Sequence, residues 1–133
     1  MSLKNLCPCG SQKPYEACCE LYHQEFNAPT CEALMRSRYS AFVFGLVDYL
    51  VETTHPNHRS KHLKEEVTLT CKNLAWTKLE VLSVWQGGEK DKVGKVSFCA
   101  HFIQNGANGV HEEHSRFKRF GKAWMYVDGE VKG

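Results

Sequence analysis

The chain has 133 residues, enough for one domain with a small appendage, and its 42% apolar and 24% charged residues are ordinary for a globular protein. Its net charge of only +2, from 17 basic and 15 acidic residues, argues against a surface that binds nucleic acid or the ribosome. No apolar run approaches the ~20 residues that span a bilayer, and no signal-peptide stretch precedes Cys7. We therefore expect a cytoplasmic protein that has no membrane partner.

Four of the seven cysteines crowd into the first part of the chain, with the spacing C-x-C-x8-C-C. Zinc prefers a tetrahedron of thiolates and imidazoles, and four thiolates complete a structural site. A proline and a glycine flank the second cysteine and suit a tight turn around an ion. We therefore predict that residues 1–26 form a zinc module whose ligands are Cys7, Cys9, Cys18 and Cys19.

Two alternatives remain open for this segment. The pair Cys18 and Cys19, or the pair Cys7 and Cys9, could form a strained disulfide, which would make the protein a thiol redox protein. His23 lies four residues after Cys19, on the same face of a helix, and could replace Cys18 or Cys19 as a ligand. The remaining three cysteines lie far apart in the sequence. Isolated cysteines of this kind usually pack as small buried apolar residues.

The middle of the chain has the periodicity of helices, with apolar residues recurring at three- and four-residue spacing. Thr30 can cap the first helix, and Gly45 ends or bends it. Pro56 stops the second helix, and Ser60 can cap the third. We predict helices over residues 31–44, 47–53 and 60–71.

The second half of the chain has the alternating pattern and the turn signals of strands. The turns are predicted at Gly87-Gly88, at Asn105-Gly106 together with Asn108-Gly109, and at Gly121-Lys122. Strands are predicted over residues 77–86, 93–103, 110–120 and 123–128. The order of elements predicts an α+β fold, in which three helices pack on an antiparallel meander after the cysteine module.

Two arginines and a histidine are candidates for a small-molecule site. Arg36 and Arg38 lie roughly 80° to either side of an apolar helix stripe centred near Tyr39, so both could reach the edge of a cavity. His101 interrupts an apolar strand face and needs a hydrogen-bond partner there. The alternatives are that the arginines pair with surface carboxylates and that His101 is a hydrogen-bonded core residue.

A second metal site is suggested by the run His111, Glu112, Glu113 and His114. Successive strand residues point to opposite faces, however, so these side chains do not converge on one ion. We interpret the run as polar side chains that face solvent.

The cysteine segment resembles the SEC-C motif, a zinc-binding module first recognised in the protein-export ATPase SecA. The matching residues are Cys7, Pro8, Cys9, Gly10, Ser11, Lys13, Tyr15, Cys18 and Cys19. Gln12 stands where the motif has glycine, and Pro14, Glu16 and Ala17 replace lysines. In SecA-like proteins the basic module contacts the chaperone SecB, the ribosome or lipid, so the loss of these lysines argues against such partners here.

The rest of the chain resembles the YchJ family of bacterial proteins. The matching segments are MRSRYSAF (35–42), DYL (48–50), HP (55–56), SRF (115–117) and WMYVDG (124–129). The resemblance implies that residues 27–133 form a domain similar to the nuclear-transport-factor-2-like fold, a cone of curved antiparallel sheet wrapped on helices. In some relatives of that fold the cone cavity is catalytic, and in others it only binds ligands.

The leading functional hypothesis is a non-enzymatic binding or adaptor protein that uses the zinc module to contact an unidentified protein partner. The alternative is a small enzyme or ligand-binding protein whose cone cavity takes an anionic small molecule, with Arg36, Arg38, Tyr39 and His101 as site residues. A thiol redox protein is the second alternative. A homodimer formed through the sheet is a further expectation, and the sequence leaves open whether the protein is an enzyme.

Overall fold

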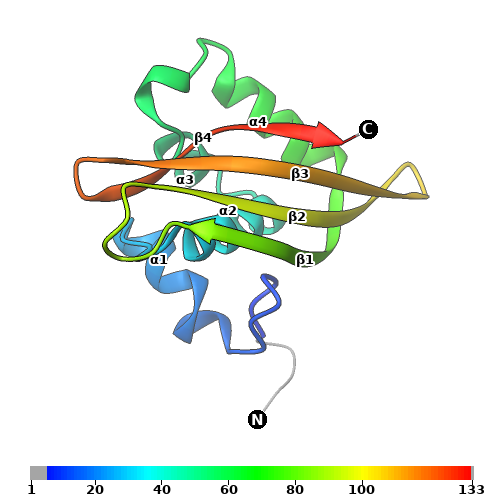
Figure 1. The fold of residues 1–133 in the computed structure, drawn as a ribbon. Coiled ribbons are helices and arrows are strands. Elements are labelled where there is room, and N and C mark those ends of the chain that lie inside the picture. The colour runs from blue at the N-terminus through cyan, green and yellow to red at the C-terminus, as the bar shows by residue number, and fades with distance from the viewer. Residues whose placement is uncertain (1–5, 133) are drawn as a thin grey trace.

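The computed structural model describes residues 6–132 (Figure 1). The cysteine module contains the 3-10 turn η2 (Tyr15–Ala17) and helix α1 (Cys19–Glu25). It is followed by α2 (Cys31–Phe44), α3 (Val47–Glu52), the 3-10 turn η3 (Pro56–His58) and α4 (Leu63–Asn73). The strands are β1 (Ala75–Gln86), β2 (Val93–Gln104), β3 (Ala107–Phe120) and β4 (Ala123–Lys132). They form one antiparallel sheet in the order β1-β2-β3-β4.

This architecture confirms the predicted fold class, α+β with an N-terminal cysteine module, helices and an antiparallel sheet. Residues 1–5 and 133, the outermost parts of the two predicted domains, lie outside the described residues. No helix among residues 6–132 has the length and apolar character that crossing a membrane requires.

The longest helix, α2, has the predicted bounds because both of its ends are specified locally. The amide of Ala33 donates to Thr30 Oγ1 at 3.0 Å, so the threonine caps the first turn. Gly45 ends the helix with a left-handed backbone, at φ 71°, which a glycine adopts without steric cost.

Three strands are longer than predicted, because β1 begins at Ala75, β3 begins at Ala107 and β4 ends at Lys132. One predicted helix cap and one predicted turn are also wrong. Helix α4 begins at Leu63 rather than at Ser60, because the Ser60 hydroxyl bonds the side chain of Glu66 instead of capping the backbone. The β2–β3 hairpin turns on Asn105-Gly106 alone, with φ values of 53° and 78°, and Asn108-Gly109 belongs to β3. The turn therefore has two residues, which fixes the register of β3 against β2.

The main core lies between α2 and one face of the sheet. Its buried residues on the helix side include Cys31, Leu34, Met35 and Tyr39, and on the sheet side Val96, Phe98, Ala100, Phe117 and Trp124. Two glycines let the start of α2 approach the sheet closely. The Cys31 amide donates to the Gly87 carbonyl at 2.9 Å, and a Cβ atom added at Gly94 would lie 2.7 Å from Cys31 Sγ.

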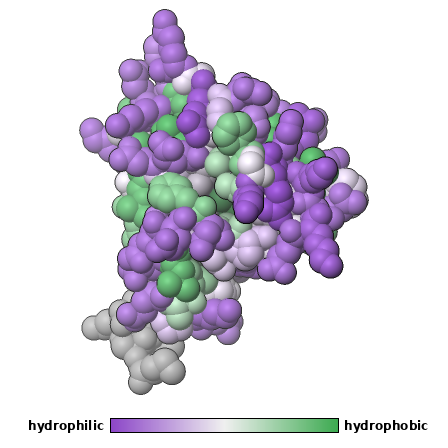
Figure 2. Space-filling view, turned by 90° about the vertical axis from the view of Figure 1, so that its left-hand side faces the viewer, coloured by the Kyte–Doolittle hydropathy of each residue, from purple (hydrophilic) through white to green (hydrophobic). Residues whose placement is uncertain are grey.

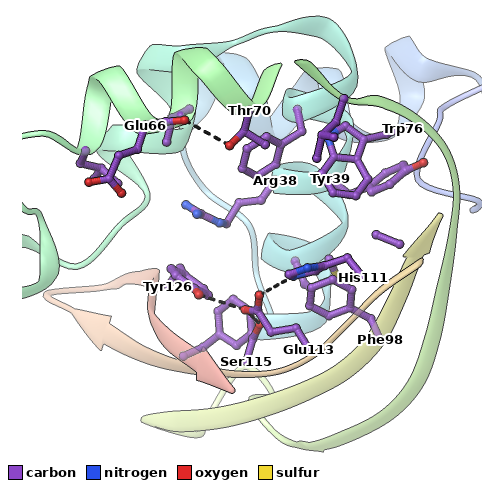
Figure 3. A pocket seen from close by; sticks show the side chains of 17 residues that line it. Arg38, Tyr39, Glu66, Thr70, Trp76, Phe98, His111, Glu113, Ser115 and Tyr126 are labelled. Atoms are coloured by element: carbon purple, nitrogen blue, oxygen red, sulfur yellow. Dashed lines mark hydrogen bonds and ion pairs between the residues drawn. The ribbon is translucent and has the colours of Figure 1, made fainter. Parts of the chain in front are cut away.

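A second buried cluster joins α2 to α3 and α4 through Ala41, Tyr49, Leu50 and Val67. Register shifts interrupt the β1–β2 and β3–β4 ladders, and such bulges increase the local bend of a sheet. The strands curve below α2 and α4 in the close view of Figure 3, and the space between them is not completely filled by side chains.

Candidate functional site

The four predicted cysteine ligands converge on one point. All four Sγ atoms lie within 4.8 Å of one another, and the sulfurs of Cys9 and Cys18 are 3.6 Å apart. Thiolates in a tetrahedral zinc site, with Zn–S bonds of about 2.3 Å, are about 3.8 Å apart. Three of the four side chains are buried. The cluster therefore has the donor set and the spacing to hold one metal ion.

A tight local turn brings the two halves of the cluster together. The Cys7 amide donates to the Lys13 carbonyl at 2.8 Å, and Leu6 pairs with Pro14 in an isolated bridge. Gln12, which stands where the SEC-C motif has glycine, keeps a left-handed backbone at φ 67°. This conformation costs an L-residue other than glycine about 1–2 kcal/mol. The turn therefore keeps its left-handed conformation with glutamine at this position, and the backbone is locally strained.

The neighbouring thiols act on each other electrostatically. Hydrogen bonds from Cys19 and Cys7 lower the pKa of Cys9, so a thiolate forms readily at this position. The hydroxyl of Ser11 lies 3.1 Å from Cys18 Sγ, where it can donate to a second thiolate.

His23 is not placed to replace a cysteine. Its Nε2 donates to the Ser37 carbonyl at 2.8 Å, and its Nδ1 accepts from the Tyr15 hydroxyl at 2.6 Å. Burial lowers the pKa of His23, which favours the neutral ring that these two bonds require. Both ring nitrogens are thus engaged within the protein, and His23 connects α1 to α2.

Arg36 also connects the cysteine module to α2. Its Nη1 donates to the Cys9 carbonyl at 2.6 Å, and its Nε donates to Glu32 at 3.0 Å. The expectation that Arg36 reaches into the cavity is wrong, because Arg36 lies on the side of α2 that faces the module. Aromatic contact between Tyr15 and Phe44, with ring centroids 4.8 Å apart, adds to the same junction.

The cavity lies between the inner face of the sheet and helices α2 and α4, and has a volume of about 440 Å³ (Figure 3). Its walls are largely apolar, and Phe42, Val67, Trp76 and Phe98 are among them. The Trp76 ring packs against four other aromatic rings, and its Nε1 is the one buried side-chain nitrogen or oxygen without a hydrogen-bond partner among the described residues. Two predicted site residues, Arg38 and Tyr39, line this space.

Arg38 places a cation inside the cavity. Its Nη1 donates to the Leu50 carbonyl at 2.9 Å and to Thr53 Oγ1 at 2.7 Å, and also lies 3.4 Å from Thr54 Oγ1. Its guanidinium carbon lies 4.5 Å from the centre of the Tyr126 ring. Burial lowers the pKa of Arg38 to about 10, so the side chain stays protonated at neutral pH. No carboxylate of the described residues lies within 4.0 Å of it, and Nε and Nη2 make no hydrogen bond with those residues.

On the opposite wall, the sheet holds a buried carboxylate. Glu113 accepts hydrogen bonds from His111 Nε2 at 2.8 Å, from Ser115 Oγ at 2.6 Å and from the Tyr126 hydroxyl at 2.9 Å. Burial raises the pKa of Glu113, but these three donors outweigh burial and bring its pKa below the usual value. Gly129 leaves room for the carboxylate, since a Cβ atom there would lie 2.2 Å from Oε2.

The interpretation of residues 111–114 as solvent-facing is wrong for His111 and Glu113. The strand register places His111 opposite Ala100, Glu113 opposite Phe98 and Ser115 opposite Val96, on the apolar inner face. A two-residue Asn105-Gly106 turn predicts this register, so the turn was the signal that could have revealed these residues. Glu112 and His114 do lie on the outer face.

The expectation that His101 faces the cavity is also wrong. Its Nε2 lies 2.5 Å from Glu80 Oε1 on the outer face of the sheet, and this pair is partly exposed to solvent. The even-numbered residues Val96, Phe98 and Ala100 form the buried face of β2 instead, because they are the more apolar of its two alternating sets.

Comparisons with known proteins agree with this geometry. The sequence model described as "YchJ, middle NTF2-like domain" matches residues 30–129, and the SEC-C motif matches residues 4–21. The chain belongs to the YchJ family. A UPF0225 protein of Vibrio vulnificus is 43% identical over 92% of this chain and 73% of its own length. The UPF0225 protein YchJ of Shigella dysenteriae is 42% identical over 96% of this chain and 84% of its own length.

Two solved structures of SEC-C motif containing proteins have the same fold as this YchJ-family chain. The solution structure from Rhodopseudomonas palustris covers 96% of this chain and 99% of that protein, with a TM-score of 0.85 and 33% identity. The crystal structure from Psychrobacter arcticus covers 98% of this chain and 85% of that protein, with a TM-score of 0.81 and 27% identity.

Proposed function

We propose that the protein binds a small organic acid in the cavity between the sheet and helices α2 and α4, and that a structural zinc ion in the cysteine module supports helix α2. The observation that carries this proposal is Arg38, a protonated guanidinium that lines an apolar cavity and has no carboxylate within 4.0 Å among the described residues. Arg38 is half-buried, and Glu113 attracts it only from beyond 4.0 Å. A cation in an apolar cavity that has no carboxylate in direct contact is costly, and an anionic ligand would offset that cost.

The shape and chemistry of the cavity favour a ligand with one anionic end and an apolar body. The free Nε and Nη2 of Arg38 form the planar fork that matches a carboxylate. Rings of Phe42, Trp76 and Phe98 provide walls for an aromatic or aliphatic body. A volume of about 440 Å³ lies within the range of small-molecule sites.

Benzoate, phenylacetate and cinnamate are suitable probes, with the corresponding neutral amides as controls. Calorimetric titration of the metal-loaded protein should show that the acids bind and that the amides bind at least about tenfold more weakly, since a hydrogen bond to a charged group contributes about 1.5–3 kcal/mol. Arg38→Met should abolish the preference for the acids, and Arg38→Lys should restore part of it. Arg116→Met, which removes an arginine from the outer face, should leave it unchanged. Equal binding of acids and amides to wild type would overturn the proposal.

For the metal we propose zinc in a structural role. Four thiolates fill a tetrahedral shell and leave no position for a substrate, and a reducing cytoplasm keeps such thiolates available. Elemental analysis of protein expressed with zinc in the medium should find one zinc per chain. A metal content near zero together with a Cys18–Cys19 disulfide would instead support the thiol redox alternative.

An adaptor role is the second candidate, and exposed apolar side chains near the cysteine module favour it. Leu21 and Phe44 are 50% and 48% exposed, and Phe26 is also exposed. Figure 2 shows one side of the molecule, on which apolar patches interrupt the hydrophilic surface. If this surface contacts a protein partner, Leu21→Ser with Phe44→Ser should abolish capture of that partner, whereas Arg38→Met should retain it.

A further inference from the structure

The wall opposite Arg38 has a second ligand-binding feature, an imidazole with one nitrogen fixed and the other free. His111 lines the cavity, and its Nε2 bonds Glu113 Oε1 at 2.8 Å. No other hydrogen bond of this ring occurs among the described residues, so Nδ1 is available to a molecule in the cavity. The ring is held in place by Phe98 and Trp76, whose centroids both lie 6.3 Å from its own.

Glu113 determines which nitrogen of His111 carries the proton. An ionised carboxylate can only accept hydrogen bonds, so Nε2 must donate, as Ser115 Oγ and the Tyr126 hydroxyl also do. In the neutral imidazole the other nitrogen, Nδ1, then has no proton and acts as a hydrogen-bond acceptor. Glu113 is therefore a positioning residue, because it sets the tautomer of the His111 ring.

Tyr126 connects the two walls of the cavity. Its hydroxyl donates to Glu113 at 2.9 Å, while the face of its ring lies 4.5 Å from the guanidinium carbon of Arg38. The cavity thus contains a cation at one wall and a fixed hydrogen-bond acceptor at the other, separated by apolar side chains (Figure 3). A ligand that satisfies both needs two different polar groups.

We propose that His111 Nδ1 accepts a hydrogen bond from the ligand, so that the ligand is an apolar acid with a hydroxyl or amino donor on the end opposite its carboxylate. This inference rests on the proposed function, because it assumes that the acid group lies at Arg38. It names the class of molecule more narrowly: hydroxy or amino acids with a compact apolar body, in preference to simple fatty or aromatic acids.

A matched series of probes tests the hydroxyl requirement separately from the acid requirement. Benzoate, phenylacetate and cinnamate would each be titrated into metal-loaded wild-type protein in unsubstituted, para-hydroxy and para-methoxy forms. For at least one of the three lengths, the para-hydroxy acid should bind about five- to tenfold more tightly than both partners, which is the effect of one added hydrogen bond. The methoxy group is the control, because it adds an oxygen at the same place but cannot donate.

Variants assign the effect to His111. His111→Phe keeps a ring against Trp76 and Phe98 but removes Nδ1, so it should remove the advantage of the para-hydroxy acids while leaving the affinity for unsubstituted acids within about twofold. Arg38→Met should do the reverse, weakening all acids alike. His114→Phe, on the outer face, is the matched control and should change neither.

The ring nitrogens can also be observed directly by NMR of the metal-loaded protein at mildly alkaline pH. We expect the nitrogen shifts of His111 to show a protonated Nε2 and an unprotonated Nδ1, and Glu113→Gln to reduce that preference. Unsubstituted acids that bind as well as hydroxylated ones would overturn this inference and leave the proposed function standing. A His111 ring with Nδ1 protonated would also overturn it. Failure of every acid to bind would overturn both.

Discussion

The cysteine module and the cavity are both polar sites, but they are assembled in opposite ways. The four thiols come from 13 consecutive residues and converge through one tight turn. The polar groups of the cavity come from α2, β3 and β4, and residues 38 and 126 become neighbours only when the sheet has closed over the helix. A local site can be identified by its spacing, whereas a site built across a sheet depends on strand register.

Helix α2 is shared by the two sites. Arg36 donates to the Cys9 carbonyl in the module, and Arg38, two residues later, lines the cavity. Ser37 between them accepts from His23 through its carbonyl and bonds the Tyr49 hydroxyl through its own hydroxyl, at 2.6 Å. The module therefore supports the wall that presents Arg38.

Removal of the metal should have the largest effect and tests how far the two regions are separate. So short a segment cannot bury enough apolar surface to fold alone, so chelation should abolish hydrogen-exchange protection in residues 6–26. The sheet and helices have their own buried clusters and should stay folded. Loss of the Arg36 and His23 contacts should lower the melting temperature of the remaining domain by on the order of 5–10 °C. Loss of protection across β2 on chelation would show that the two regions share one cooperative unit.

The next largest effect should come from removing a carboxylate from the inner face of the sheet, Glu113, compared with one on the outer face, Glu80. Glu113→Ala leaves one buried donor, Ser115, and two half-buried donors, His111 and Tyr126, without their acceptor, and should reduce the free energy of unfolding by roughly 2–4 kcal/mol. Glu80→Ala removes the exposed partner of His101 and should change the free energy of unfolding far less, because water screens an exposed pair. Urea unfolding of both variants measures the comparison. Similar values for the two would mean that the inner network contributes no more than a surface pair.

The same network should also make the free energy of unfolding depend on pH, with a smaller effect than its removal. The pKa of Glu113 is lower in the folded protein, so its stabilising contribution is complete above its unfolded value, about 4.3, and is lost as the pH falls through the folded value. The difference in unfolding free energy between wild type and Glu113→Gln should therefore shrink on acidification below about pH 4.3. A difference that is constant across this range would exclude Glu113 as a group with a lowered pKa.

The smallest expected effect concerns strain inside the module. Gln12→Gly removes the steric cost of a left-handed φ, partly offset by the greater freedom of glycine in the unfolded chain, for a gain of at most about 1 kcal/mol. Competition with a chelator should show up to roughly fivefold tighter metal binding. Gln24→Gly, in the last turn of α1, is the control and should weaken binding instead, because glycine lowers the stability of the helix. Weaker binding by Gln12→Gly would mean that the glutamine side chain itself supports the turn.

The sequence predicted the parts of this molecule that depend on local signals. The cysteine spacing placed Cys7, Cys9, Cys18 and Cys19 in one module, and the cap at Thr30 and the glycine after Phe44 gave the bounds of α2. The helical stripe placed Tyr39 correctly at the cavity, along with Arg38 at its margin.

The remaining site residues could not be placed without the strand register. Alternation alone shows that His111, Glu113 and Ser115 share a face but not which face is buried. The same ambiguity placed His101 inside, although the alternate residues of β2 are the more apolar set. Arg36 was misplaced for a different reason, since its partner is a backbone carbonyl of Cys9 and no sequence pattern marks such an acceptor.

The most direct test of the binding proposal is a crystal structure of the metal-loaded protein grown with the acid that binds most tightly. We expect the acid inside the cavity, with its carboxylate bonded to Nε and Nη2 of Arg38 and its donor group directed at Nδ1 of His111. An acid bound on the outer surface, or bound inside the cavity with its carboxylate away from Arg38, would contradict it.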